Sequence, residues 1–226
     1  MAERLATWVW VGAAALACVA GIVNVIGYLG FQHQAITHLT GNTSLLGAAL
    51  VAGDGHTSMQ LFGAIGAFVA GAALNGLIIQ ADALQLGRRY GLVLTIESLL
   101  LIVAVPMFQR QNLAGPLIAA VACGLQNAMA TTYSGAVVRT SHISGMFTDL
   151  GIMIGHAIRG APLARRRMAL SALVISFFFL GGLAGSLLFS ASAYQSLYLP
   201  AAITGTVGIA YLVYTQRWRA VRFPGK

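Results

Sequence analysis

Charged residues are scarce in this 226-residue chain: they make up 8% of it, whereas hydrophobic residues make up 58%. A soluble domain carries roughly 25% charged residues, so the shortage excludes an ordinary water-soluble fold. Residues 5–53 and 168–216 contain no charged side chain at all. Because a membrane-spanning helix needs about 20 apolar residues, each run holds at least two hydrophobic segments. We predict an all-α integral membrane protein with no soluble catalytic domain.

Cysteine is also rare, since the chain has only Cys18 and Cys123, both in apolar surroundings. Two such residues favour small buried hydrophobes over a disulfide framework or a cysteine metal site. His38 and His142 occupy matching positions in a repeated motif, but two histidines without a third and fourth ligand make a weak metal site. We therefore expect no metal and no cofactor.

The 13 basic residues give the chain a net charge of +8, and they gather at the ends of apolar segments. Clusters lie at 88–89, at 165–167 and between 217 and 226. This is the distribution of cytoplasmic loops beside a membrane, which favours the lipid bilayer over nucleic acid as the partner.

Six apolar stretches are long enough to cross a bilayer, and two are shorter. The long stretches are Thr7–Gly30, Met59–Gln80, Tyr90–Met107, Asn112–Tyr133, Met168–Ser190 and Gln195–Tyr214. The short stretches are Thr43–Gly53 and Met146–Ile158. At 1.5 Å per residue the first short stretch covers about 16 Å of a core about 30 Å thick. The second contains Asp149, so neither is a convincing span.

The positive-inside rule favours six crossings over eight. If both short stretches enter and leave by one face and the N-terminus is cytoplasmic, every basic residue except Arg110 lies inside. If both crossed instead, Arg88, Arg89 and Arg139 would lie outside. We therefore predict a multi-pass membrane protein with both termini in the cytoplasm.

A polar motif occurs twice. Gly-Ile-Val-Asn at 21–24 recurs as Gly-Leu-Gln-Asn at 124–127, and Thr-His-Leu-Thr-Gly at 37–41 recurs as Ser-His-Ile-Ser-Gly at 141–145. Polar groups in apolar segments are costly and usually functional. A duplicated polar motif in a membrane protein indicates a transporter or channel built from two repeats.

We predict two repeats, 1–111 and 112–226, that form one membrane domain. With six crossings each repeat has three spans and one short re-entrant half-helix, so the second repeat is inserted upside down. The two short helices then enter from opposite faces, and their polar starts meet near the midplane. With eight crossings the repeats would be parallel and these starts would not meet.

A helix that begins inside a membrane presents unpaired N–H groups and a partial positive charge. Such an end attracts an anion, a carboxylate or a carbonyl oxygen. We expect the Thr, Ser and Asn residues of the motif to cap these helix starts, with Thr148 and Asp149 in the first turn of the second one. The predicted substrate-binding residues are Asn24, Thr37, His38, Thr40, Gly41, Asn42, Gln126, Asn127, Ser141, His142, Ser144, Gly145 and Thr148.

Some of these polar residues have a structural alternative. Each of Asn24 and Asn127 follows a glycine by three positions, so its amide can join the helix to its own short hairpin. Gln126 has no counterpart in the first repeat, where Val23 stands, which favours a substrate contact for Gln126. Gly181 and Gly185 suit close helix packing, either within the chain or between the copies of a homo-oligomer.

Glu97 and Asp149 are the two acidic residues inside apolar segments. An ionised carboxylate in such a segment is costly, so Glu97 should be protonated, paired or beside a wet cavity. We predict a role in proton coupling for both residues. A structural pairing of Glu97 with Arg139, His38 or His142 is the alternative.

Three segments of the chain resemble the YoaK-like family of bacterial membrane proteins, grouped as domain of unknown function 1275. They lie at 21–28, 39–43 and 123–127, and the likeness covers nearly the whole chain. The resemblance implies an integral protein of the bacterial cytoplasmic membrane with about six helices, and it implies no substrate. Many relatives carry Asp where this chain has Asn24, which shifts any coupling role to Glu97 and Asp149.

The sequence favours a small-solute transporter, with proton coupling at Glu97, over three alternatives. A passive channel would show flux that is independent of a pH gradient. An intramembrane enzyme using a hydroxyl near His142 and Asp149 is disfavoured, because catalytic roles normally differ between repeat halves. A scaffold would keep Glu97 and Gln126 packed dry with no cavity between the repeats.

Overall fold

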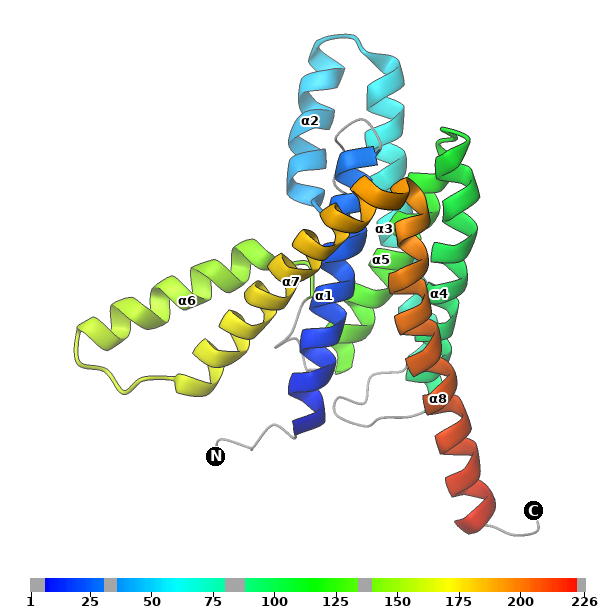
Figure 1. The fold of residues 1–226 in the computed structure, drawn as a ribbon. Helices are drawn as coiled ribbons and strands as arrows, with labels where there is room; N and C mark the ends of the chain where they lie inside the picture. The colour runs from blue at the N-terminus through cyan, green and yellow to red at the C-terminus, as the bar shows by residue number, and fades with distance from the viewer. Residues whose placement is uncertain (1–6, 31–35, 80–87, 134–139, 223–226) are drawn as a thin grey trace.

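The computed structural model describes residues 7–30, 36–79, 88–133 and 140–222 (Figure 1). These residues form helices and turns without any strand, which confirms the predicted all-α class. The helices are α1 (Thr7–Gly30), α2 (Leu39–Val51), α3 (Gly55–Ile78), α4 (Arg88–Gln109), α5 (Ala114–Tyr133), α6 (Ile143–Ile158), α7 (Arg165–Ser192) and α8 (Tyr198–Arg222), with a short 3-10 helix, η1 (Ala193–Leu197), before α8.

Four helical segments of the described chain are long and apolar enough to cross a membrane. They are α1, α3, α4 and the continuous stretch Arg165–Thr215, which contains α7, η1 and most of α8. Ala193 breaks that stretch with a positive φ of 47°. The six-crossing arrangement counts α7 and α8 separately and adds the 20-residue α5. That number of crossings stays a prediction.

The two short helices begin earlier than the apolar stretches indicated. α2 starts at Leu39 instead of Thr43, and α6 starts at Ile143 instead of Met146. Each ends at a glycine with positive φ, 70° at Gly53 and 82° at Gly160, which is the usual left-handed stop of a helix. α2 and α3 therefore form one hairpin, and α6 and α7 form another.

Asp54 fixes the start of α3. Its carboxylate accepts a hydrogen bond of 3.0 Å from the backbone N–H of Thr57, as an N-cap does. Hydrogen bonds from the side chain and backbone of Thr57 lower the pKa of this carboxyl, because they favour its charged form.

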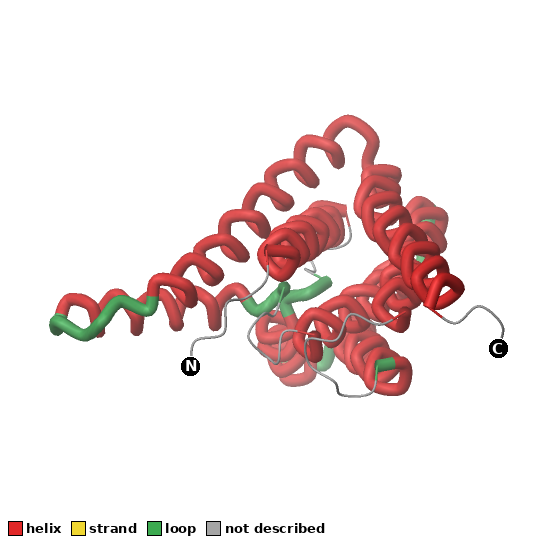
Figure 2. The backbone as a smooth tube through the Cα atoms, turned by 90° about the horizontal axis from the view of Figure 1, so that it is seen from below, coloured by secondary structure: helices red, strands yellow, loops and turns green. Residues whose placement is uncertain are grey.

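The long helices pair between the two halves of the chain. α1 packs along α7, α3 packs along α5, and α4 packs along both α5 and α8. The α2–α3 and α6–α7 hairpins point away from the centre in different directions (Figures 1 and 2). In Figure 1, α1, α4 and α7 run upward, whereas α3, α5 and α8 run downward. The start of α1 and the end of α8 lie at the same end of the molecule.

Glycines let the α1–α7 and α3–α5 pairs cross with their backbones in contact. A Cβ on Gly71 of α3 would lie 2.0 Å from the Val121 carbonyl oxygen of α5. A Cβ on Gly181 of α7 would lie 2.1 Å from the Cys18 carbonyl oxygen of α1. Cys18 and Val121 are 103 residues apart, so the two crossings use matching positions of the repeat.

The reciprocal contacts match as well. A Cβ on Gly21 would lie 2.1 Å from the Phe178 carbonyl oxygen, and a Cβ on Gly124 would lie 2.0 Å from the Phe68 carbonyl oxygen. Equivalent positions of α3 and α7 are therefore 110 residues apart in the sequence, as Phe68 and Phe178 are. Gly181 and Gly185 both pack on α1 within the chain, which is the first of the two roles expected for them.

The glycine crossings give a prediction about stability. Gly71→Ala and Gly181→Ala should each lower the free energy of unfolding by roughly 1–3 kcal/mol or more, because a backbone carbonyl cannot move aside for the new methyl group. Gly76→Ala on α3 is the matched control, since a Cβ there would meet no atom within 4 Å. Thermal unfolding in detergent measures the difference. Equal unfolding temperatures for Gly71→Ala and Gly76→Ala would contradict the crossing.

Candidate functional site

The starts of α2 and α6 open into one cavity of about 470 Å³. α1, α3, α5 and α7 contribute the rest of its wall. The lining residues are Asn24, Thr37, His38, Leu39, Thr40, Phe68, Asn127, Ser141, His142, Ile143, Ser144, Phe147 and Phe178. We call this space the helix-start cavity. It brings together most of the substrate-binding residues predicted from the repeated motif.

The two helix starts have almost the same geometry. His38 precedes α2 with φ −91° and ψ 64°, and His142 precedes α6 with φ −91° and ψ 56°. Neither helix has a hydrogen bond from the side chain of its N-cap residue. The first N–H groups of both helices are therefore not taken up by N-cap side chains, and they give each start a partial positive charge.

The spacing between histidine and glycine in the motif has a steric cause. A Cβ on Gly41 would lie 2.2 Å from Cδ2 of His38, and a Cβ on Gly145 would lie 2.3 Å from Cε1 of His142. Each imidazole thus rests over the first turn of its helix, in the space that a side chain on the glycine would fill. Both histidines remain exposed to the cavity.

The expectation that hydroxyl groups cap these helices is wrong for Thr43 and Thr148. Their hydroxyls instead donate to carbonyl oxygens one turn earlier in the same helix, at 2.8 and 3.0 Å, as does the neighbouring Ser44 hydroxyl at 3.1 Å. This happens because α2 and α6 start three or four residues earlier than predicted, so these residues lie inside the helices. Asp149 likewise falls in the second turn of α6 instead of the first.

Asn24 anchors the segment that leads into α2. Its Oδ1 accepts hydrogen bonds from the backbone N–H of Thr37 at 3.1 Å and from the Thr37 hydroxyl at 2.7 Å. This is the structural role that we considered for the repeated spacing between glycine and asparagine in the motif, a link from the helix to its own short hairpin.

The second repeat lacks that anchor among the described residues. Oδ1 of Asn127 and the hydroxyl of Thr140, which is 103 residues after Thr37, are both buried without a hydrogen-bond partner there. Buried polar atoms are normally paired, so such atoms call for an explanation. Asn127 is also on the wall of the cavity.

Several predicted residues lie away from the cavity wall. Glu97 and Gln126 are buried, each 2% exposed, and neither lines the cavity. Asn42 is buried within α2, whereas Thr148 and Asp149 are exposed on α6 beyond the cavity. Arg139, one of the partners considered for Glu97, lies outside the described residues.

Three aromatic residues of the cavity were not predicted from the sequence. Phe68, Phe147 and Phe178 contribute rings from α3, α6 and α7. Phe68 and Phe178 each stand three residues before a crossing glycine, Gly71 and Gly181. This Phe and Gly pair, which recurs 110 residues later, is the sequence feature that could have identified the two phenylalanines.

The lining described above contains no acidic residue, no lysine and no arginine. Its polar groups are hydroxyls, amides, imidazoles and the starts of two helices. A site of this composition suits an anion or a carbonyl oxygen better than a cation. Among the described residues no group of three or more His, Cys, Asp or Glu side chains is placed to hold a metal ion.

The profile of a family described as "Protein of unknown function (DUF1275)" matches residues 12–210. The chain belongs to the DUF1275 family. In this DUF1275 protein the matched region includes every lining residue of the helix-start cavity. No curated protein and no solved structure matches the chain.

The hydrogen bonds between Asn24 and Thr37, which Asn127 and Thr140 lack among the described residues, give a prediction. Thr37→Val should lower the free energy of unfolding by about 1 kcal/mol, because it removes a hydrogen bond to Asn24. Thr140→Val is the matched control, and it should be neutral or stabilising because the Thr140 hydroxyl has no partner among the described residues. Thermal unfolding of the two purified variants checks both signs. A larger loss in Thr140→Val than in Thr37→Val would refute the difference between the repeats.

Proposed function

We propose that this DUF1275 protein is a small-solute transporter with its substrate site in the helix-start cavity. The observation that carries the proposal is the meeting of two uncapped helix starts, each with its histidine and hydroxyl groups, in one cavity. Discontinuous helices with their N-terminal ends at the solute are a recurring arrangement in secondary transporters. The composition of the wall favours a solute with a carboxylate or another anionic group.

We further propose that the chain consists of two inverted-topology repeats. The matching glycine crossings and the opposite directions of α1 and α5, α3 and α7, and α4 and α8 support this organisation. α2 and α6 would then be re-entrant helices from opposite faces. The resemblance to the YoaK-like family implies a location in the bacterial inner membrane, and the distribution of basic residues supports an orientation with both termini in the cytoplasm.

The alternatives make different demands on the structure. A scaffold accounts for the buried Glu97 and Gln126, but it gives no reason for a cavity lined by duplicated polar residues. An enzyme would need a hydroxyl hydrogen-bonded to a base such as His142, and no hydroxyl of the described residues makes that bond to His142. A passive channel shares the site with a transporter and differs in its flux.

The first experiment is a thermal-shift screen of the purified protein with matched anionic, neutral and cationic small solutes. We expect stabilisation by anions. Each hit is then tested for flux in proteoliposomes with and without a pH gradient. Flux that ignores the gradient would favour a channel, and the absence of both binding and flux across the solute classes would count against the proposal.

Variants of α6 locate the site. Ser144→Ala should weaken the binding of a hit by about tenfold, because one hydrogen bond contributes about 1 kcal/mol or slightly more. Thr148→Val is the control on the same helix, one turn further from the cavity, and should leave the affinity unchanged. Titration calorimetry measures both. If Thr148→Val weakens binding and Ser144→Ala does not, the solute binds elsewhere.

A further inference from the structure

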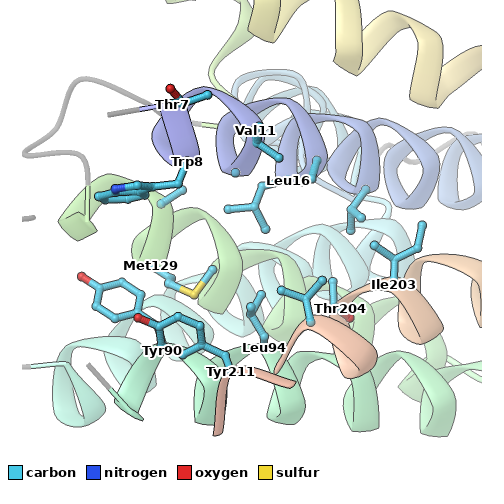
Figure 3. A pocket seen from close by; sticks show the side chains of 15 residues that line it. Thr7, Trp8, Val11, Leu16, Tyr90, Leu94, Met129, Ile203, Thr204 and Tyr211 are labelled. Carbon is cyan, nitrogen blue, oxygen red and sulfur yellow. The ribbon is translucent and has the colours of Figure 1, made fainter. Parts of the chain in front are cut away.

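Two interfaces that the repeat relates to each other differ in how closely their helices pack. α4 packs closely against α5, but the related pair, α8 and α1, barely touch. Between α1 and α8 lies a second cavity of about 530 Å³, which we call the α1–α8 cavity. Figure 3 shows Val11 and Leu16 of α1 facing Leu94 of α4 and Ile203 of α8 across this space.

Two related glycines show the same difference at the level of single atoms. A Cβ on Gly115 of α5 would lie 2.8 Å from the backbone nitrogen of Phe108 on α4, so this glycine is needed for close packing. Gly12, 103 residues earlier on α1, lines the α1–α8 cavity, and a Cβ there would meet nothing within 4 Å. A glycine inside a helix costs about 1 kcal/mol relative to alanine. Gly12 bears this cost without any close contact in this conformation.

Glu97 lies at the closely packed α4–α5 interface. The neighbouring residues Thr95 and Ser98 face α8, where the Ser98 hydroxyl donates to the Ala201 carbonyl at 2.7 Å. The Glu97 carboxyl lies near the buried thiol of Cys123 on α5. At the offset of 110, the counterpart of Glu97 is Val207, which lines the α1–α8 cavity. Glu97 is 2% exposed and Val207 is 50% exposed.

The carboxyl of Glu97 must be neutral in this conformation. Among the described residues it has no cationic partner, and its Oε2 has no hydrogen-bond partner. The titratable side chains on the packed helices include Cys123 on α5 and Tyr90, which stands seven residues before Glu97 on α4. Tyr211 of α8 lies beside Tyr90, and Tyr194 of η1 stacks on Phe108 at the far end of α4. None of them supplies a positive charge, and an isolated buried carboxylate is strongly unfavourable.

We propose that the α4–α5 interface is a proton-controlled gate, which opens as the α1–α8 cavity closes. When the gate opens, α4 separates from α5 while α8 packs against α1. Glu97 then becomes as exposed as Val207 is in the present conformation. Water then reaches the carboxyl, and its O–H proton passes to that water. Closing again requires the carboxylate to take up a proton. The proposal rests on the proposed transport function, because this exchange would carry the helix-start cavity from one face to the other.

Two related reporter positions can follow the exchange without any solute. Leu16 lines the open cavity, and its counterpart Ala119 on α5 is fully buried. We would place a single cysteine at either position, Leu16→Cys or Ala119→Cys, in a protein that also carries Cys18→Ala and Cys123→Ala. The reaction rate of each thiol with N-ethylmaleimide is measured in detergent between pH 5 and 9, and the ratio of the two rates largely cancels the titration of the thiols themselves.

Raising the pH should increase the rate at Ala119→Cys relative to the rate at Leu16→Cys. One coupled proton changes the ratio by up to about tenfold per pH unit while the carboxyl titrates. Glu97→Gln should hold the ratio at its low-pH value, because the amide cannot ionise. Glu97→Asp should restore the pH dependence. Size-exclusion profiles establish that the variants are folded.

The second readout is the distance between spin labels at Val11→Cys and Val207→Cys, which should shorten as the pH rises. It leaves the packed α4–α5 interface untouched and therefore decides the matter if Ala119→Cys disturbs the fold. A ratio and a distance that do not change with pH would overturn the gate, and so would an unaltered pH response in Glu97→Gln. If the gate responds to pH as expected but proteoliposomes show no flux of any solute, the transport function alone is overturned.

Discussion

Hydrocarbon offers no hydrogen-bond partner, so a helix that begins within a membrane must begin against protein or water. In the re-entrant arrangement that we propose, α2 and α6 are such helices: both begin at the helix-start cavity, and no side chain of their N-cap residues takes up their first N–H groups. The glycine crossings of α1 with α7 and of α3 with α5 bring the two helix starts to one place. The histidines then lie over glycines, which keeps polar groups around both starts while leaving the cavity between them open.

Three features could be predicted from the sequence: the helical class, the approximate extents of the long helices and the pairing of the two polar motifs. It failed at the helix caps, because hydroxyl-rich segments suggest capping wherever a helix is thought to start, and α2 and α6 start at Leu39 and Ile143. It also missed Phe68 and Phe178. The repeat offset changes from 104 at the half-helices to 110 at α3 and α7, because α6 is three residues longer than α2 and the turn before α7 is three residues longer than the turn before α3.

Glu97 could be recognised as unusual from the sequence, but its surroundings could not. An acid in an apolar helix can face a substrate, a partner or another helix, and only the packing distinguishes these cases. The structure separates Glu97 from the helix-start cavity and sets it in the α4–α5 interface. The comparison with its counterpart Val207 explains why this location matters. The α4–α5 interface is closed over an acidic side chain, whereas the related α1–α8 interface is open beside an aliphatic one.

The crossings of α1 with α7 and of α3 with α5 also bear on how the molecule is assembled. Each half of the chain keeps its crossing glycines on a face that only the other half can cover. When α1 enters the bilayer during synthesis, its main neighbour α7 is still more than a hundred residues from being made. The first half must therefore wait in the membrane as loosely associated helices. Completion of the second half is then the event that locks both halves together, and a chain cut short before α7 would lack the packing that holds α1.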